Sequence, residues 1–509
     1  MNKPQPLTTP SVKHIPFAYG MAAAADKLAA AISIVVFLIS ILGYWVYRWR
    51  NPRCNGRLPP GSMGFPLLGE TLQFIAPHTD AGVSPFLKER IKRYGPVFKT
   101  SLFGLRVVAS AEPEFSYSIL QQEGSFASWY PESLAKIFGE KTLPYVPAPT
   151  YKYAKSLLWK MFGLESLRET LVPEFEEFAC RFLQKWSQTP SIEVHDAVSD
   201  MVFDLTAKKL ISYDPAKWSW NFRKTFDELM KGVSSFPLDI PGTTYSQCLK
   251  IRKKTVKMLE KMMEERIGCP EVKHGDFLDI LINERKNEKT LITHELAVDL
   301  IFGLLFAAFD PTCSTLTLTI KLISENPEVL EALQEEHKKI LKKKEDPSSG
   351  LTWEDCKSMK LTAMVITEAT RLSNFAGMIF RKASHDYTTK EGYTIPAGWA
   401  VMVCPPVSHF NPEVYKDPLT FNPWRWEKGT VDITGRSKDY LAFGSGLRHC
   451  AGADFSKTQM SVFLHHLLMN YRWTVIEGGT VGWRPEIYFP NGFHIRLEKK
   501  SKEEQVKTN

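Results

Sequence analysis

The segment "FGSGLRHCAG", residues 443–452, contains the residue best suited for chemistry. Gly444 and Gly446 predict a tight loop, and Cys450 ends that loop just before a helical pattern begins. A helix N-terminus offers free backbone N–H groups and a partial positive charge, which stabilise a thiolate. Such a thiolate could be a nucleophile or a metal ligand, whereas a single buried cysteine is more often a small apolar side chain. The glycines and Arg448, which could pair with an acidic group, favour a chemical role.

A second unusual pair, Asp310 and Pro311, interrupts the apolar segment "LLFAAFDPTCSTL", residues 304–316. A carboxylate is costly in an apolar interior, and proline within a helix removes a hydrogen bond and crowds the carbonyl of Ala307. Small residues share one face of this predicted helix, namely Gly303, Ala307, Pro311 and Ser314. Such a face most often packs against another helix, but it could also leave room for a flat ring.

Two charged residues three positions apart, Glu368 and Arg371, share one face of a predicted helix and can touch. Most such pairs are solvated and contribute little to stability, but apolar neighbours favour burial here. The segment "FNPWRW", residues 421–426, places Arg425 among aromatic side chains. Arg425 could complete a network with the other two residues, although this segment alone would be only an aromatic-rich loop.

Helical periodicity dominates the segments that must position these residues. Apolar spacing and capping residues predict helices over 165–187, 294–323, 327–344, 352–372 and 453–470. The period shifts in "TIPAGWAVMVCPPV", residues 394–407, which predicts short strands and turns. The predicted fold is therefore mainly α with a smaller β part.

Composition excludes several classes of protein. The net charge is 64 − 56 = +8 over 509 residues, and no basic cluster with interleaved aromatic residues suggests nucleic acid as a partner. A mildly basic face would suit an anionic lipid surface or an acidic protein partner. The eight cysteines are scattered without a Cys-x-x-Cys pair, so we expect neither a disulfide scaffold nor a zinc site, and we expect a reducing compartment.

Residues 28–47, "LAAAISIVVFLISILGYWVY", contain no charge and are long enough to cross a bilayer as a helix. Arginines follow immediately, which predicts a cytoplasmic location for the C-terminal side. A cleaved signal peptide is the competing interpretation, but the apolar run is long, starts late and has no small-residue cleavage site after it. The proline-rich segment "RLPPGSMGFPLLGE", residues 57–70, predicts a stiff linker or a hinge that sets how the globular part sits on the membrane.

The expected organisation follows from these boundaries. Residues 1–27 form a lumenal segment, 28–47 a transmembrane anchor, 48–70 a basic and proline-rich hinge, and 71–509 the catalytic domain. The length alone would allow about three domains, but no linker, repeat or charge block divides residues 60–495.

The motifs together, in this order and at these separations, resemble the cytochrome P450 family, the heme-thiolate monooxygenases. The loop matches the family pattern Phe-x-x-Gly-x-Arg-x-Cys-x-Gly at Phe443, Gly446, Arg448, Cys450 and Gly452. The resemblance extends over nearly the whole chain and implies the cytochrome P450 fold with heme b as the cofactor.

The resemblance implies a role for each matching residue. Cys450 would be the axial ligand of the heme iron, and its electron donation would favour O–O cleavage. Phe443 would pack beside the heme, Gly444 and Gly446 would shape the loop, and Gly452 would let the next helix approach the ring. Other expected heme contacts are Arg381, Arg448, Ala307, Tyr151 and Lys155, of which the last two could equally be ordinary surface positions. Glu368, Arg371 and Arg425 would be a structural network beneath the heme.

The family pattern on the central helix is Ala/Gly-Gly-x-Asp/Glu-Thr-Thr/Ser, and it aligns with Ala307 to Thr312, where Ala308 stands in place of the glycine and Pro311 in place of the first threonine. Asp310 would be the acid of a proton relay, or a carboxylate paired across helices. Pro311 replaces the threonine whose hydroxyl normally helps deliver protons to dioxygen. Water, Thr312 or a substrate hydroxyl could replace it; alternatively carbon–carbon cleavage is favoured, or the enzyme is poorly coupled and releases peroxide.

The flanks of these motifs most resemble the plant branch that oxidises sterols, brassinosteroids and triterpenoids. The resemblance implies hydroxylation of a sterol or triterpenoid, with sterol side-chain cleavage to a pregnane as the alternative because of Pro311. Electrons would come from an NADPH-cytochrome P450 reductase docking on a basic face with Lys155, Lys160 and Lys457, at the endoplasmic reticulum membrane. A heme protein that only transfers electrons or binds lipid, and a membrane-tethered scaffold without cofactor, are the other classes considered.

Overall fold

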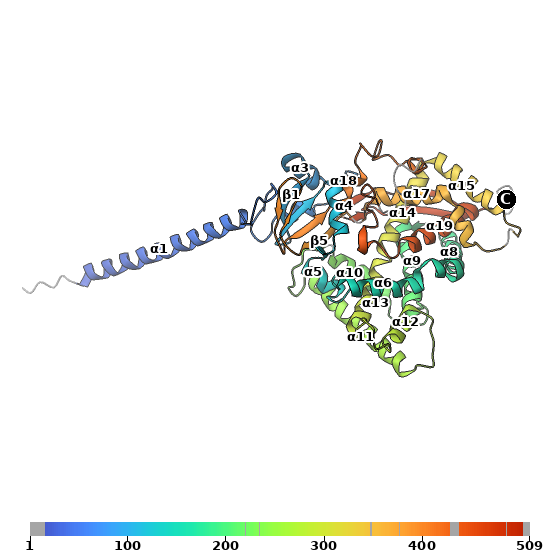
Figure 1. Cartoon of the computed structure of the whole chain (residues 1–509), viewed down its shortest axis with the longest axis horizontal. Helices are drawn as coiled ribbons and strands as arrows, with labels where there is room; N and C mark the ends of the chain where they lie inside the picture. Colours follow the sequence, from blue (N-terminus) through green and yellow to red (C-terminus); the bar gives the residue numbers. More distant parts are fainter. Residues whose placement is uncertain are drawn as a thin grey trace, which may run out of the picture.

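The computed structural model describes residues 16–218, 220–233, 235–346, 349–375, 377–427, 437–484 and 486–501. Residues 1–15 of the predicted lumenal segment lie outside this part of the chain. Helices predominate and strands are fewer and shorter, so the predicted fold class is confirmed. Figure 1 shows strands β1 and β5 near the end of α1, and helices such as α8, α15 and α19 farther from it.

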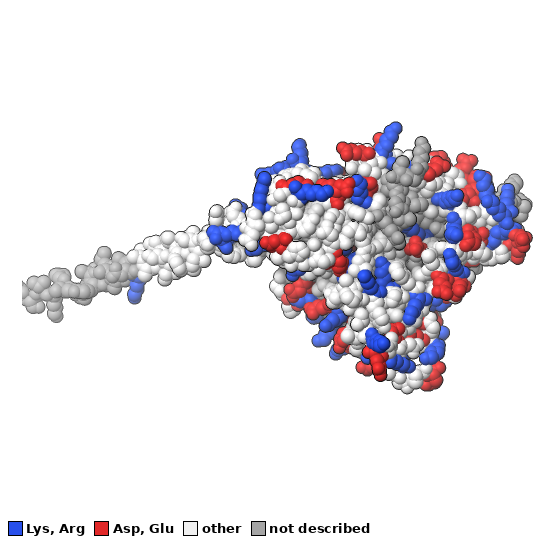
Figure 2. Space-filling model, viewed as in Figure 1, with Lys and Arg blue, Asp and Glu red and all other residues white. Residues whose placement is uncertain are grey.

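Helix α1 (Pro16–Arg50) is longer than the predicted anchor at both ends and projects away from the rest of the molecule (Figure 1). Its segment Lys27–Arg50 has a mean hydropathy of 2.3 and no buried residues, and it is long and apolar enough to cross a membrane. In Figure 2 this segment is almost free of charge, while basic side chains gather where it meets the globular part. A helix with an apolar surface all round is unstable in water, so α1 is a candidate membrane span.

The proline-rich segment after α1 is docked on the first strand, β1 (Val97–Leu102), rather than extended as a free linker. The backbone of Lys99 donates to the carbonyl of Pro60 at 2.8 Å, and Gly61 forms a bridge to Lys99. A Cβ atom at Gly61, where φ is +143°, would lie 2.0 Å from the Lys99 carbonyl oxygen, so only glycine allows this contact. The segment therefore fixes the base of α1 against the sheet.

The largest sheet has five strands in the order β1-β2-β8-β5-β3. Its other members are β2 (Leu105–Ser110), β8 (Ala400–Val403), β5 (Ile379–Ala383) and β3 (Phe126–Ser128). Neighbouring strands are antiparallel except β2 and β8, which are parallel. The predicted strands in residues 394–407 correspond to β7 (Thr394–Ile395) and β8, followed by the short helix α18 (Pro405–His409).

The helices around the site enclose the largest hydrophobic core. They are α6 (Ala148–Phe162), α8 (Val172–Ser187), α9 (Val194–Ile211), α10 (Phe222–Val233), α13 (His294–Ala307), α14 (Asp310–Glu325), α15 (Pro327–Lys342), α17 (Lys360–Ser373) and α19 (Ala453–Asn470). Helix α19 follows the predicted boundaries, and α8 begins a few residues later than predicted because the five residues before it form a π-helical turn.

The predicted helix over residues 294–323 is wrong in one respect, since it is two helices. Helix α13 ends at Ala307 and α14 begins at Asp310. Pro311 lies in the first turn of α14, where a missing N–H costs nothing because those N–H groups have no helical acceptor. The proline thus starts a new helix instead of distorting an old one.

The predicted helix over residues 352–372 is also divided. Thr352 and Asp355 form the predicted capping box of α16 (Trp353–Ser358), and α17 starts at Lys360 after a break at Met359.

Candidate active site

The loop before α19 is closed by its own backbone. The N–H of Cys450 donates to the carbonyl of Phe443 at 2.9 Å, and Gly444 and Gly446 adopt φ values of +69° and +66°. A Cβ atom at Gly446 would lie 2.3 Å from the carbonyl oxygen of Leu120, so this glycine is required for the loop to approach its neighbour. The loop therefore places the Cys450 thiol next to the N-terminus of α19, as the sequence predicts.

Cys450 and Ala307 are exposed, although the segments that carry them lie in the interior of the protein. Ala307 ends α13, most of whose residues are buried. Crowding by protein atoms raises the pKa of the Cys450 thiol, while the N–H of Gly452 and the ammonium groups of Lys155 and Lys457 act to lower it. A residue that is enclosed and yet accessible faces an interior space, which is the setting required for a bound group.

Arg448 is engaged by protein groups. Its guanidinium donates to Glu123 Oε1, at 2.9 Å from Nε and 2.5 Å from Nη2, and to the carbonyls of Leu143 and Val146. It also lies over the ring of Tyr151, 4.2 Å from the centroid. Glu123, which the motif gave no reason to select, therefore occupies much of the hydrogen-bonding capacity expected for an acidic cofactor group.

Arg381, on β5, offers the more available guanidinium. It is 3% exposed, its Nη1 donates to the Phe380 carbonyl, and its Nε has no hydrogen-bond partner among the described residues. Burial lowers the pKa of Arg381, and Tyr130 and Glu123 act to raise it. A buried, incompletely bonded cation is costly unless an anion joins it, so Arg381 is well suited to bind a carboxylate.

Tyr151 and Lys155 both lie on α6 and face the cysteine loop. Tyr151 is buried, and burial raises its pKa to about 12. The Lys155 ammonium donates to the His449 carbonyl at 2.8 Å and to the Leu447 carbonyl at 3.4 Å. Neither residue is an ordinary surface position, and Lys155 stabilises the loop that presents Cys450.

The three residues of the interrupted helix have different environments. Asp310 is 9% exposed and Pro311 is half-buried. The hydroxyl of Thr312 donates to the Ala308 carbonyl at 3.1 Å. Its proton is therefore already in a hydrogen bond with the backbone at the helix break. Among the described residues, none donates a hydrogen bond to the Asp310 carboxylate.

Groups from three other elements surround Asp310. Burial raises the pKa of Asp310, while the charges of His195 on α9 and Arg223 on α10 act to lower it. Burial and the nearby Asp310 raise the pKa of Glu486, on β11 (Glu486–Tyr488). Arg223 lies 5.1 Å from the ring centroid of Phe309 and pairs with Asp196 at 3.5 Å. Only the packing of these elements brings Glu486, Arg223 and His195 toward Asp310, since no spacing in the sequence relates them.

Glu368, Arg371 and Arg425 are brought together as predicted. Glu368 and Arg371 are fully buried, and two hydrogen bonds of 2.9 and 2.8 Å join them. Arg425 donates to Glu368 Oε1 at 2.9 Å and Trp426 donates to Oε2 at 3.0 Å. The remaining donors of Arg371 reach the carbonyls of His409 and Pro418, both at 2.7 Å. This network ties α17 to the segment before the cysteine loop.

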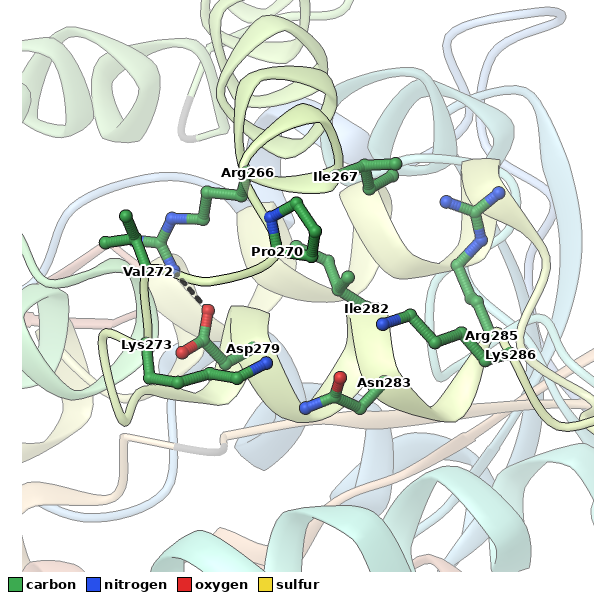
Figure 3. A pocket seen from close by; sticks show the side chains of 10 residues that line it. All are labelled: Arg266, Ile267, Pro270, Val272, Lys273, Asp279, Ile282, Asn283, Arg285 and Lys286. Atoms are coloured by element: carbon green, nitrogen blue, oxygen red, sulfur yellow. Dashed lines mark hydrogen bonds and ion pairs between the residues drawn. The ribbon is translucent and has the colours of Figure 1, made fainter.

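A cavity of about 210 Å³ lies elsewhere, between helices α11 (Thr244–Gly268) and α12 (Phe277–Glu284). Figure 3 shows basic and apolar side chains in its lining, with Arg266 bonded to Asp279. None of the residues that the sequence singled out lines this cavity. We therefore do not assign the active site to it.

Comparison with known proteins agrees with this arrangement. The family profile described as cytochrome P450 matches residues 59–486. The chain belongs to the cytochrome P450 family. This P450 is consequently an oxidoreductase of the monooxygenase type, and its family and fold imply a heme cofactor.

Several plant P450s are similar to this P450. Cytochrome P450 87A3 of Oryza sativa subsp. japonica is 51% identical over 460 residues, which cover 90% of this chain and 89% of the relative. Cucurbitadienol 11-hydroxylase of Siraitia grosvenorii is 40% identical, with 92% and 99% covered. Cholesterol 22-monohydroxylase CYP90B52 of Paris polyphylla is 33% identical, with 92% and 98% covered.

A solved structure supports the fold of this P450. Retinoic acid-bound cyanobacterial CYP120A1 superposes with a TM-score of 0.76 at 24% identity, covering 88% of this chain and all of that one. The residues present fit a heme: Cys450 is accessible at a helix N-terminus, Arg381 has an unbonded Nε, and a Cβ atom at Gly452 would meet nothing within 4 Å.

Proposed function

We propose that this P450 hydroxylates a sterol or triterpenoid, using dioxygen and electrons that originate from NADPH. The names of the similar plant enzymes support this substrate class, because they specify cucurbitadienol and cholesterol as the molecules hydroxylated. The bound heme b would supply the activation of dioxygen, with one oxygen atom inserted into a C–H bond and the other reduced to water. Cys450 would bind the iron, and Arg381, whose Nε has no partner among the described residues, would bind a carboxylate of the porphyrin. Arg448 would bind the other carboxylate only by exchanging its hydrogen bonds to Glu123 for it.

Near Asp310, the residues of the protein would deliver protons from the surface to the site where dioxygen is activated. Asp310 is buried without a hydrogen bond, and Arg223 connects it electrostatically to the more exposed Asp196. Protons would reach Asp310 from the surface through this group of ionisable residues. Pro311 offers neither a hydroxyl nor an N–H, so the final donor must be water, the substrate, or Thr312 after it leaves the Ala308 carbonyl.

Side-chain cleavage of a sterol by successive oxidations is the alternative that Pro311 suggests. It is less favoured than hydroxylation, since the similar enzymes named for their reactions are hydroxylases. Product analysis distinguishes the two, because cleavage yields a shortened steroid and hydroxylation retains all carbon atoms.

The electron donor would be an NADPH-cytochrome P450 reductase that docks near the cysteine loop. Of the three lysines expected there, Lys160 is the most accessible, with a side chain 60% exposed. Lys155 binds loop carbonyls, and Lys457 lies 4.8 Å from the centroid of the Phe443 ring. Lys160 would therefore provide docking charge, and the other two would mainly stabilise the loop.

The proposed location is the endoplasmic reticulum membrane, with α1 as a single span and the catalytic domain in the cytosol. The apolar segment Lys27–Arg50 and the arginines at its C-terminal end support this orientation. Exposed apolar side chains in the adjoining segment, Phe65 and Leu67, would contact the lipid surface.

The decisive experiment is product analysis after co-expression with a plant NADPH-cytochrome P450 reductase and a panel of sterols and triterpenoids. We expect an oxygenated product of unchanged carbon number from at least one member, and the absorption spectrum of a thiolate-ligated heme for the reduced carbon-monoxide complex. The Cys450→Ala variant should lose both. Product formation by that variant, or a panel with no oxidised member, would overturn the proposal.

A further inference from the structure

An exposed thiol on α8 lies beside a histidine that is paired with a carboxylate. Cys180 Sγ is 3.5 Å from Nδ1 of His466 on α19, and His466 Nε2 is 3.1 Å from Glu176 Oε1. None of these residues belongs to the site described above. We propose that Cys180, His466 and Glu176 form a thiol modification site, in which His466 activates Cys180 for reaction with hydrogen peroxide.

The packing of α8 against α19 produces this arrangement. Glu176 and Cys180 are four residues apart on α8, so they lie one above the other on the same face. The ring of His466 fits between them, with one nitrogen toward each side chain. His466 is 8% exposed, whereas Cys180 is exposed, so the base is shielded and the nucleophile is accessible.

The hydrogen-bonding partners give the imidazole the orientation that a base requires. The nitrogen that faces the Glu176 carboxylate, Nε2, lies at ion-pair distance from it and is favoured to bear a proton. Nδ1 then faces both the Cys180 thiol and the Asn470 amide, each 3.5 Å away, and can accept the thiol proton. Glu176 is held in position by the backbone N–H of Leu351, which donates to its Oε2 at 2.9 Å. This is the relation between nucleophile, base and orienting acid found at activated thiols.

The charges around His466 favour its protonated form. Burial acts to lower the pKa of His466, but hydrogen bonds with Cys180 and Glu176 outweigh it and raise the pKa to about 9. Burial acts to raise the pKa of Glu176, but its interactions with His466 outweigh that effect and lower it. The other titratable groups near this site are Lys344, His465, Tyr471, Cys356 and His337.

No other cysteine has this environment. All eight lie in the described part of the chain, and only Cys180 is hydrogen-bonded to a histidine there. Burial raises the pKa of six others, Cys54, Cys248, Cys313, Cys356, Cys404 and Cys450. Cys269 is exposed without a hydrogen-bonded histidine and is therefore a matched control within the same chain.

The reaction is a two-electron oxidation of sulfur. With His466 protonated, the proton of the Cys180–His466 pair is held on Nδ1, and Cys180 reacts as the thiolate beside this imidazolium. The thiolate sulfur attacks one oxygen of hydrogen peroxide. The O–O bond breaks, a sulfenic acid forms on Cys180, and the departing hydroxide takes the proton from His466 to become water. Peroxide is reduced as the sulfur is oxidised, and no further reactant is needed.

The test uses the full-length holoprotein with a limiting amount of hydrogen peroxide at pH 7, without NADPH. Sulfenic acid is trapped with dimedone, and the labelled peptides are quantified by mass spectrometry over time. A free thiol is only ~3% ionised at this pH, so we expect Cys180 to react about tenfold faster than Cys269. Equal rates at the two cysteines would overturn the proposal without any variant.

Two variants test the role of the neighbouring residues. In the His466→Gln variant, the rate of Cys180 oxidation should fall to about that of Cys269. In the Glu176→Gln variant it should fall by less. The rate of Cys269 oxidation should be the same in both variants as in the wild type. The heme spectrum reports whether each variant remains folded. If Cys180 in a folded His466→Gln protein reacts as fast as in the wild type, His466 does not activate it and the proposal fails.

Discussion

At the scale of single residues, the interrupted helix shows how one substitution alters both backbone and chemistry. Pro311 starts α14 and has no N–H to donate. The neighbouring Thr312 bonds to the Ala308 carbonyl, so neither residue offers a free hydroxyl toward Ala307. In the proposed relay, protons from Asp310 would therefore pass through water, the substrate, or Thr312 after its hydroxyl leaves the Ala308 carbonyl.

Pro311→Thr restores the hydroxyl at this position. We expect several-fold less hydrogen peroxide per molecule of product, because protons reach dioxygen before it is lost as peroxide. The measurement is peroxide release together with product formation and NADPH consumption. The matched control is Thr312→Val, which removes a hydroxyl already bound to the backbone and should change coupling little. Unchanged coupling and unchanged products in the Pro311→Thr variant would defeat this explanation.

Asp310→Asn removes the buried carboxylate that is available for proton exchange. We expect kcat to fall by about 10²-fold and the solvent deuterium isotope effect to increase, as proton transfer becomes limiting. Asp310→Glu retains the acid and should recover much of the rate. An Asn variant with wild-type kcat and isotope effect would show that Asp310 has only a structural role.

At the scale of elements, two buried polar clusters hold helices together. One is Glu368 with Arg371 and Arg425, in which a single carboxylate accepts hydrogen bonds from two arginines and a tryptophan. The other is a pair of imidazoles between α15 and α19, where Nδ1 of His337 and Nδ1 of His465 lie 3.0 Å apart. Both clusters combine groups that are costly to bury singly.

Glu368→Ala leaves Arg371 charged and fully buried without its partner. We expect the free energy of unfolding to fall by about 3–5 kcal/mol, measured by denaturant titration of the holoprotein. The matched control is Glu132→Ala, which breaks an exposed pair with Lys136 and should cost no more than about 1 kcal/mol. Equal losses in the two variants would contradict a special role for the buried network.

The imidazole pair predicts how stability depends on pH. Thr362 donates to Glu336, so its oxygen accepts the proton on His337 Nε2, and His465 must donate between the rings. Burial lowers the pKa of His337 from 6.5 to about 3, so this residue is neutral in the fold. Its contribution to stability is complete above the unfolded value of 6.5 and is lost as the pH falls toward 3.

We therefore expect the unfolding temperature of the holoprotein to decrease from pH 7 to pH 5. His337→Gln, which keeps a donor but does not titrate, should show a shallower decrease over the same range. The nearby charged groups are His466 and Lys344, and they are the same in both proteins. Parallel pH curves for the two proteins would contradict the assignment.

At the scale of the whole molecule, α1 projects from a globular part whose surface carries both acidic and basic side chains. Figure 2 shows acidic and basic side chains interspersed over the visible face of that part. Within Lys27–Arg50, where the side chains of α1 are described, no residue is buried by protein. Lipid is the partner that would cover this apolar surface, and the docked proline-rich segment would transmit a fixed orientation to the sheet.

Deletion of residues 1–50 should move the protein from the carbonate-resistant membrane fraction to the fraction that carbonate or salt extracts. Exposed Phe65 and Leu67 would still allow weak membrane association. The mass of the purified full-length protein tests the competing signal-peptide interpretation. A mature N-terminus beyond residue 50 would show that α1 is removed and does not anchor the enzyme.

The sequence by itself determined the features that depend on local spacing. Cys450 at the start of α19, the Glu368–Arg371 pair and the capping box at Thr352 lie where they were predicted, because each depends on neighbours within a few residues. The fold class followed from periodicity for the same reason. The sequence predicts that Pro311 destabilises a continuous helix. It does not show that one helix ends at Ala307 and another begins at Asp310.

Only the tertiary structure decided which distant residues meet. It gave Arg448 the partner Glu123, grouped His195, Arg223 and Glu486 with Asp310, and placed His466 between Cys180 and Glu176. Burial and neighbouring charges then shifted the pKa values of Asp310, Glu486, Glu176 and His466, because desolvation and charge contacts depend on every element packed around a group. No spacing in the sequence encodes such contacts, since each depends on how separate helices and strands pack.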